Sequence, residues 1–476
     1  MTALEERFVW VSRAPARDYR RVAEEFPELP GFEPTSAAVA LRTVLLDAGL
    51  DGARAGTAAW NPLSAMVEPG MNVVIKPNWV SHQNAGPDGW ECLVTHPSLV
   101  EALARYVLKA HPRRLTIGDA PVQGCDFDAL MRVTGTRAAL DRLPAGATDV
   151  TIADFRLVSL DAGPAGAARG SASRTTADYV AFDLGPESLL EPITTGEAPF
   201  RVTMYDPRAL AETHAPGRHQ YLVAREVVEA EVVVNVPKLK THKKAGITGA
   251  LKNLVGINGH KSYLPHHRKG GSLDGGDCYE GHSLLKARAE DTLDAANRLG
   301  GGRMKALLYR SAEVLERAGT STDDVGGLEG SWHGNDTVWR MSLDLQRLLR
   351  YGRSDGRLAE APQRSILSVT DAIVAGQGEG PLAPSPCPLG LITVAANAAA
   401  AEWVHAELMG FDPRRIPIVV HAFDAFRYPL AAFPPEAIGV RVGGARLTPA
   451  DAGRALGARV VAPRGWQGAC ERPVEV

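Results

Sequence analysis

Three cationic or titratable side chains alternate at the end of an apolar segment of the chain. Lys238, Lys240 and His242 follow the valine-rich run 232–236. Such a run is typical of a buried strand, and alternate residues of an extended chain point to one face. We therefore predict that these side chains converge at a strand end and bind a negatively charged ligand. The competing interpretation is a solvated edge where lysines extend into water.

The residues downstream offer further groups for an anion. Thr248 and Lys252 are four apart and would share a helix face, and Asn253 adds an amide. The amino terminus of a helix also favours anions. We predict His242 as general acid/base, because an unperturbed histidine titrates near neutral pH. Lys238 and Lys252 are the other catalytic candidates, since burial among cations lowers a lysine pKa.

Two other apolar segments also end in polar residues. One ends in Lys76-Pro77-Asn78 and the other in Gly118-Asp119. Taken alone, each could be a satisfied turn residue. Together with 238–242 they predict a rim built from several strand ends, where α/β proteins bind ligands. The predicted substrate-binding residues are Lys76, Asn78, His96, Lys240, Thr248, Asn253, Asn335 and Arg340.

Four carboxylates are candidates for binding a divalent cation such as Mg²⁺, which prefers oxygen ligands, provided that they converge in the fold. They are Asp119, Asp336, Asp371 and Glu402. Asn335 or Asp336 could instead cap the helix that follows. The histidines at 260, 266 and 267 are poorly spaced for one ion, because adjacent histidines rarely face the same metal.

Two glycine-rich segments approach nucleotide-binding motifs without completing them. Segment 376–381 follows a predicted strand, but Pro381 and the prolines after it prevent the helix that the dinucleotide fingerprint requires. Segment 256–262 has His260 where a phosphate-binding loop needs its second glycine. We therefore predict neither an NAD nor an ATP cofactor.

Strand and helix patterns alternate on both sides of a helical middle. We predict an α/β fold, with mainly parallel sheet, flanking helices and a helical and loop insertion. The predicted parts are a lead-in (1–70), a first α/β part with anion-binding strand ends (71–256), a glycine-rich lid with a helical insertion (257–360) and a C-terminal α/β part (361–476). The predicted strands include 71–78, 115–118, 150–154, 179–184, 231–236, 365–375, 389–395 and 416–421. The predicted helices include 36–48, 283–299, 303–318, 335–350 and 397–409.

Composition narrows the expected partners and compartment. The 476 residues carry a net charge of -3, too weak a field to indicate nucleic acid or an anionic membrane. Five cysteines without a C-x-x-C pair argue against a disulfide framework, a zinc ribbon or an iron–sulfur cluster held by this chain. We see no signal peptide and no stretch able to span a bilayer. A reducing cytoplasm is the expected location.

The order of the motifs resembles a known family. The matching segments, 74–78, 95–97, 118–121, 236–242, 248–256 and 371–381, occur in the order of the family catalogued as "domain of unknown function 362". Segment 332–344 is similar to a part of its longer members. Some relatives carry a ferredoxin-like cluster domain, whose cysteines are missing here. Where members tend to have an aspartate, this chain has Glu402, which keeps the carboxylate on a longer arm.

We interpret the chain as an enzyme acting on a small anionic substrate, either a carboxylate or a phosphorylated compound, in a biosynthetic pathway. Acid/base chemistry fits the residues, and lyase, isomerase and transferase reactions stay open. The alternative is a redox-accessory or non-catalytic binding protein related to the iron–sulfur-linked members of the family.

Overall fold

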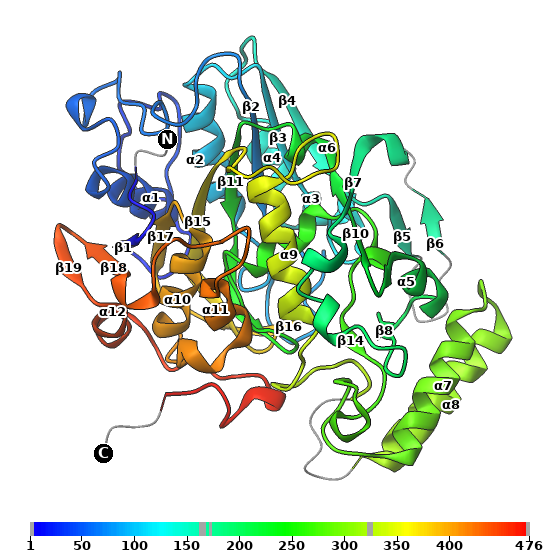
Figure 1. Cartoon of the computed structure of the whole chain (residues 1–476). Helices are drawn as coiled ribbons and strands as arrows, with labels where there is room; N and C mark the ends of the chain where they lie inside the picture. The colour runs from blue at the N-terminus through cyan, green and yellow to red at the C-terminus, as the bar shows by residue number, and fades with distance from the viewer. Residues whose placement is uncertain (1–3, 161–167, 171–173, 321–326, 473–476) are drawn as a thin grey trace.

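A large mixed sheet passes through the protein (Figure 1). The structure, a computed structural model, describes residues 4–160, 168–170, 174–320 and 327–472. Its twelve-stranded sheet contains β1 (Phe8–Arg13), β2 (Asn72–Pro77), β3 (Arg114–Asp119), β4 (Asp149–Asp154), β11 (Val232–Val236), β12 (Lys238–His242), β13 (Gly246–Thr248), β15 (Ser365–Glu379), β16 (Ala383–Cys387), β17 (Leu391–Ala395), β18 (Gly439–Val442) and β19 (Ala445–Leu447). The main order is β19-β18-β1-β17-β15-β11-β2-β3-β4. The predicted α/β fold with a mostly parallel sheet is confirmed.

The strands that matter for the site run parallel. β15, β11, β2, β3 and β4 are neighbours in this order, and each pair is parallel. Val236 lies opposite Pro77 in the register of β11 and β2. Because the carboxyl ends of parallel strands meet at one edge, the residues after Pro77, at Asp119 and after Val236 come together there.

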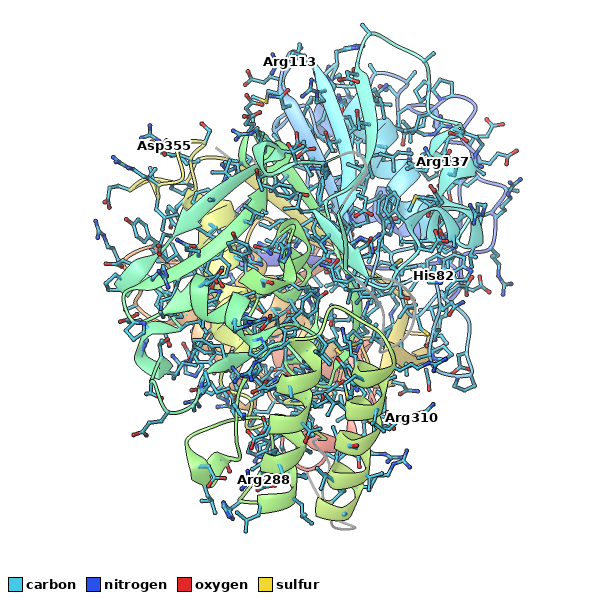
Figure 2. All side chains as sticks on the ribbon, turned by 90° about the vertical axis from the view of Figure 1, so that its right-hand side faces the viewer. His82, Arg113, Arg137, Arg288, Arg310 and Asp355 are labelled. Carbon is cyan, nitrogen blue, oxygen red and sulfur yellow. The ribbon has the colours of Figure 1, made fainter. Side chains whose placement is uncertain are left out.

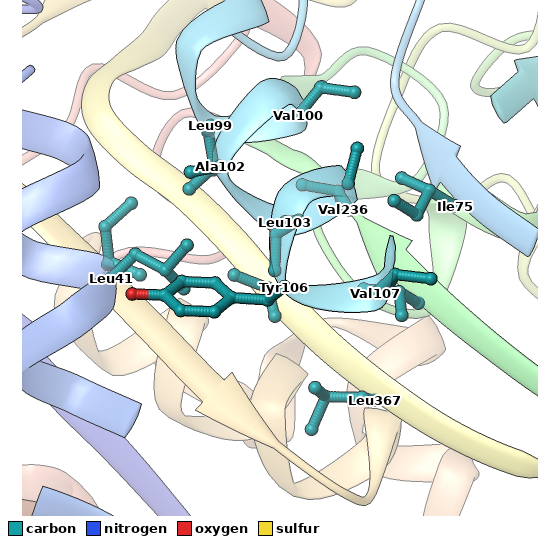
Figure 3. Close-up of a cluster of buried hydrophobic side chains, with 14 of the residues drawn as sticks. Leu41, Ile75, Leu99, Val100, Ala102, Leu103, Tyr106, Val107, Val236 and Leu367 are labelled. Atoms are coloured by element: carbon teal, nitrogen blue, oxygen red, sulfur yellow. The ribbon is translucent and has the colours of Figure 1, made fainter. Parts of the chain in front are cut away.

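Side chains of the parallel strands alternate between two apolar layers. Val73 and Ile75 pack in one cluster with the helices α1 (Ser36–Asp47) and α2 (Pro97–Leu108). Figure 3 shows this layer, with Leu103 of α2 near Val236 and the Tyr106 ring extending toward Leu41 of α1. Val74 packs on the opposite face with α9 (Val338–Tyr351). The sheet is thus covered on both sides, as parallel strands require.

Smaller sheets and helices surround this core. β7 (Tyr179–Asp183), β10 (Arg218–Ala224) and β9 (His214–Ala215) form a three-stranded sheet. β8 (Phe200–Arg201) pairs with β14 (His267–Arg268), and β5 (Val158–Leu160) pairs with β6 (Ala168–Gly170). The remaining α-helices outside the insertion are α3 (Phe127–Val133), α4 (Thr136–Leu140), α5 (Pro207–Thr213), α6 (Arg225–Val228), α10 (Ala398–Leu408), α11 (Pro417–Val420) and α12 (Pro449–Leu456).

Two insertion helices project from the body as a hairpin. α7 (Leu284–Asn297) and α8 (Arg303–Gly319) pack against each other and extend away from the sheet (Figures 1 and 2). Arg288 and Arg310 mark the two helices in Figure 2. These two predicted helices and the helix α9 are confirmed. Within the described residues, no helix is both long and apolar enough to cross a bilayer.

Three local predictions are wrong. The predicted strand 416–421 is the short helix α11 followed by a 3-10 turn, and Pro417 occupies the first helical position, which suits proline. The strand pairing does not stop at the end of the predicted strand 231–236, because the chain continues as β12 and the Pro237 carbonyl accepts from the Asp371 amide. Thr248 and Lys252 do not share a helix face. Thr248 ends β13, and Lys252 begins a 3-10 helix over Lys252–Ile257.

Candidate anion-binding site

A cavity of about 390 Å³ opens at the carboxyl edge of β2 and β3. Six of the predicted site residues line it: Asn78, Asp119, His242, Thr248, Lys252 and Asn253. The other walls come from segment 202–205, from Lys243 and Lys244 after β12, and from Lys261, His266 and Glu329 of the insertion. The insertion therefore completes a site that the parallel strands begin.

Two lysines of this lining have no ion-pair partner in the part of the chain that the structure describes. Neither the Lys252 nor the Lys261 ammonium has a hydrogen-bond or ion-pair partner among the residues that the structure describes, and Lys252 is only 8% exposed. Burial, followed by the charges of Lys261, Lys244 and Lys76, lowers the pKa of Lys252 to about 7. Burial also lowers the pKa of Lys261 to about 8. A bound anion would stabilise the charged form of both ammonium groups and would raise their pKa values again.

A hydrogen-bonded layer lies behind the cavity wall. Lys76, fully buried, donates to Asp119 at 2.7 Å and to Asn253 Oδ1 at 3.0 Å. The Asp119 carboxylate also accepts from the Trp79 and Ala120 amides at 2.6 and 2.9 Å. Lys76 is therefore a supporting residue that does not itself line the cavity.

Lys240 has a similar supporting position. Its ammonium donates to Asn78 Oδ1 and to the Leu93 carbonyl, both at 2.5 Å, and no carboxylate pairs with it among the described residues. Burial, and then the charge of Lys238, lowers its pKa well below the usual lysine value. Its contact orients the Asn78 amide, which does line the cavity.

The two cavity histidines have opposite tautomers. The Lys244 amide donates to His242 Nδ1 at 3.1 Å, so the neutral ring carries its proton on Nε2. His266 Nδ1 lies 2.6 Å from the Leu264 carbonyl, which can only accept, so Nδ1 carries the proton and Nε2 keeps its lone pair. Burial lowers the pKa of both rings well below the usual value. His242 Nε2–H is thus suited to donate a hydrogen bond and His266 Nε2 to accept one, while the lowered pKa values keep both rings neutral.

Glu329 is the second carboxylate of the lining, after Asp119. Its Oε2 lies 3.9 Å from both Lys243 Nζ and Lys244 Nζ. The charge of Lys244 lowers the pKa of Glu329. Even with this carboxylate ionised, the lysines of the lining outnumber its acidic groups.

Lys238 and Asp371 form a core ion pair outside the cavity. Lys238 Nζ lies 2.7 Å from Asp371 and 2.5 Å from the Tyr19 hydroxyl, which in turn donates to Asp371 at 2.7 Å. The His96 amide also donates to Asp371, and its ring stacks on Tyr19 at 3.7 Å. None of these residues lines the cavity. This placement argues against the predicted acid/base role of Lys238 and the substrate contact of His96.

The remaining predicted residues make structural contacts at the start of α9 and within α10. Asp336 pairs with Arg340 at 3.1 Å and accepts from the Trp339 indole, while Asn335 Oδ1 accepts from the Thr337 and Val338 amides at the start of α9. Glu402 lies 3.2 Å from His405 within α10. The helix-cap interpretation of Asn335 is therefore the one the structure supports.

The four predicted metal carboxylates do not come together. Asp119 and Asp371 bind different lysines, Asp336 binds Arg340, and Glu402 contacts His405. Among the described residues, the one group of three His, Cys, Asp or Glu side chains with mutually close ligand atoms contains none of these four. The condition for the predicted Mg²⁺ site, convergence, is not met.

Several lining residues are absent from the predicted set. Lys243 and Lys244 directly follow His242, so they could have been included in the predicted anion site from the sequence. Lys261 belongs to the incomplete phosphate-binding pattern 256–262 and His266 to the poorly spaced histidines. Only the folding of the insertion over the strand ends brings these two residues and Glu329 to the cavity.

Comparison with known proteins gives three findings. A protein-family model described as "Domain of unknown function (DUF362)" matches residues 73–183 and 186–407. A thylakoid-associated protein of Synechocystis sp. is 22% identical over 359 residues, covering 75% of this chain and 69% of that protein. A crystal structure of a Thermotoga maritima protein aligns with 74% of this chain and 54% of its own, at 9% identity and a TM-score of 0.27. The chain thus spans about half the length of that protein, and so low a score supports no further comparison.

Proposed function

The chain belongs to the family described as domain of unknown function 362, whose name assigns no reaction, and we propose from the cavity that it binds and transforms a small anion. The observation that carries this proposal is a pair of ammonium groups, on buried Lys252 and half-buried Lys261, which share one cavity and have no ion-pair partner among the described residues. A carboxylate or phosphoryl group between them would supply the missing negative charge.

The cavity also holds groups for proton transfer. With a pKa of about 7, the Lys252 amine is present near neutral pH both as a base or nucleophile and as an acid. His266 Nε2 can accept a hydrogen bond from the substrate, and His242 Nε2–H and the Asn78 amide can donate hydrogen bonds to substrate oxygens. We therefore assign acid/base or imine chemistry to Lys252, with His266 Nε2 as a hydrogen-bond acceptor for the substrate.

The first experiment measures anion binding by calorimetry. We expect sulfate and pyrophosphate to bind, and Lys252→Met and Lys261→Met each to weaken binding about tenfold or more. Lys109→Met is the control, because this ammonium donates to the Ala58 carbonyl outside the cavity. Sulfate keeps a constant charge over pH 6–9, so its affinity should fall as pH rises through the two lysine pKa values. Equal affinities for all four proteins would contradict the proposal.

The second experiment separates catalysis from binding. A small oxo acid and cyanoborohydride should trap an imine on Lys252, located by peptide mass spectrometry, if this amine is the nucleophile. Anion binding without trapping or turnover of candidate anionic substrates would favour the non-catalytic alternative. We also propose a cytoplasmic location, which the five free cysteines support.

A further inference from the structure

A second cluster of polar side chains lies where the α7–α8 hairpin joins the body. His267 of β14, Cys278 of the following loop and Glu290 of α7 are all buried. Their candidate ligand atoms all lie within 4.8 Å of one another. None of the three is among the residues that line the anion cavity.

His267 is the member that hydrogen bonding leaves unexplained. The side chain is 2% exposed, and its Nδ1 has no hydrogen-bond partner among the described residues. A buried ring nitrogen without a partner is costly, and each such atom in a folded protein calls for an explanation. A bound cation at this point would satisfy it.

The donor types indicate which cation. One imidazole nitrogen, one thiolate sulfur and one carboxylate oxygen form a mixed set that suits Zn²⁺, whereas Mg²⁺ and Ca²⁺ take oxygen ligands. Zinc sites with three protein ligands keep a fourth position for water. A small cavity of about 20 Å³, lined by His267, Glu290, Thr203 and others, provides room for one water molecule beside the cluster.

Two cations near the cluster pair with other carboxylates and leave Glu290 free to bind a metal ion. Arg201 and Lys269 pair with Asp294 at 2.8 and 2.9 Å, and Lys269 also pairs with Asp291. These cations therefore have their own carboxylates. Glu290 accepts from the Gly270 amide at 3.0 Å, which orients the carboxylate next to Cys278 and His267.

We propose that His267 Nδ1, Cys278 Sγ and the Glu290 carboxylate bind a zinc ion, with a water as the fourth ligand. The ion ties α7 to β14, and β14 pairs with β8. Segment 202–205 after β8 and His266 before His267 both line the anion cavity. The zinc thus holds one wall of that cavity in place, independently of which anion binds there.

The test begins with metal analysis of the full chain. Protein equilibrated with Zn²⁺ and then gel-filtered should retain about one zinc per chain. Cys278→Ser and Glu290→Gln should lower this retained zinc at least tenfold. The matched controls Cys470→Ser and Glu407→Gln replace another buried cysteine and a buried glutamate paired with Arg472, and should retain it.

Cobalt substitution tests the thiolate ligand directly. Co²⁺ bound to the wild-type chain should show a near-ultraviolet thiolate-to-metal charge-transfer band, which Cys470→Ser keeps and Cys278→Ser loses. Wild-type protein that retains no zinc and shows no such band would overturn the proposal, as would a Cys278→Ser variant with an unchanged band. If Cys278→Ser fails to fold, the wild-type cobalt spectrum and the zinc content of Glu290→Gln still decide whether the zinc site exists.

Discussion

At the scale of single residues, Lys252 shows how position sets chemistry. Its ammonium is buried among the charges of Lys261, Lys244 and Lys76 and has no carboxylate partner among the described residues. The folded state therefore disfavours the proton that the unfolded chain holds readily. The same cost that weakens folding makes the residue a usable acid/base and anion ligand near pH 7.

Replacing Lys252 should stabilise the protein at low pH. With a folded pKa of about 7 against 10.5 unfolded, the unfolded state binds more protons between these pH values, so stability rises with pH across this window. Below pH 7 the penalty is fully present. Lys252→Met should raise the free energy of unfolding at pH 6 by roughly 2–4 kcal/mol, with the gain shrinking toward pH 10.

Urea unfolding of both proteins at pH 6, 8 and 10 measures this difference. Lys109→Met, outside the cavity, should show no pH-dependent gain. A Lys252→Met variant that is less stable than wild type at pH 6 would show that the ammonium is better compensated than the geometry indicates.

At the scale of elements, one glycine lets the 3-10 helix approach the strand ends. A Cβ on Gly256 would lie 1.9 Å from Asp119 Oδ1 and 2.8 Å from Lys76 Nζ. The Gly256 carbonyl also accepts from the Ala120 amide at 2.9 Å. The close packing of this turn against β3 therefore depends on the absence of a side chain.

Gly256→Ala should displace Asp119 and weaken both folding and anion binding. We expect a loss of about 1–3 kcal/mol in unfolding free energy, from the steric conflict at a buried ion pair. Gly124→Ala is the matched control, because Gly124 lines the same cavity and its added Cβ would meet nothing within 4 Å. Thermal unfolding and sulfate calorimetry compare the two, and equal behaviour would refute the steric argument.

The Lys238–Asp371 pair joins β12, β15 and the N-terminal segment through Tyr19. Removing one member leaves an uncompensated buried charge, so Asp371→Asn should cost about 3–5 kcal/mol. The exposed pair Arg114–Asp149 is the control, and Asp149→Asn should cost less than about 1 kcal/mol. Urea unfolding measures both losses. If Asp371→Asn lowered the free energy of unfolding by less than about 1 kcal/mol, Lys238 would again be a candidate for a functional role.

At the scale of the whole molecule, the sheet joins segments far apart in the chain. β1 near the N-terminus lies between β17 and β18, which come from the last quarter of the chain. Both β1 and β18 fall outside the matched family segments. The sheet thus draws its strands from the predicted parts 1–70, 71–256 and 361–476.

We expect these parts to unfold together in calorimetry, because a shared sheet couples them. Val9→Asp should lower the midpoint of this one transition, since Val9 is fully buried in β1, whereas Arg13→Asp at the exposed end of the same strand should shift it little. Two separated transitions in the wild-type scan would instead favour independent domains.

The sequence by itself determined the α/β class, half of the twelve strands of the large sheet and six residues of the cavity, from Asn78 to Asn253. It could do so because strand period and polar strand ends are local patterns. Only the tertiary structure decided that Lys238 pairs in the core while Lys252 has no ion-pair partner among the described residues, since both are lysines near an apolar segment in the sequence. It also decided that Lys261, His266 and Glu329 face the cavity, and that His267, Cys278 and Glu290 meet. These juxtapositions depend on how a long insertion packs, and no local spacing records that.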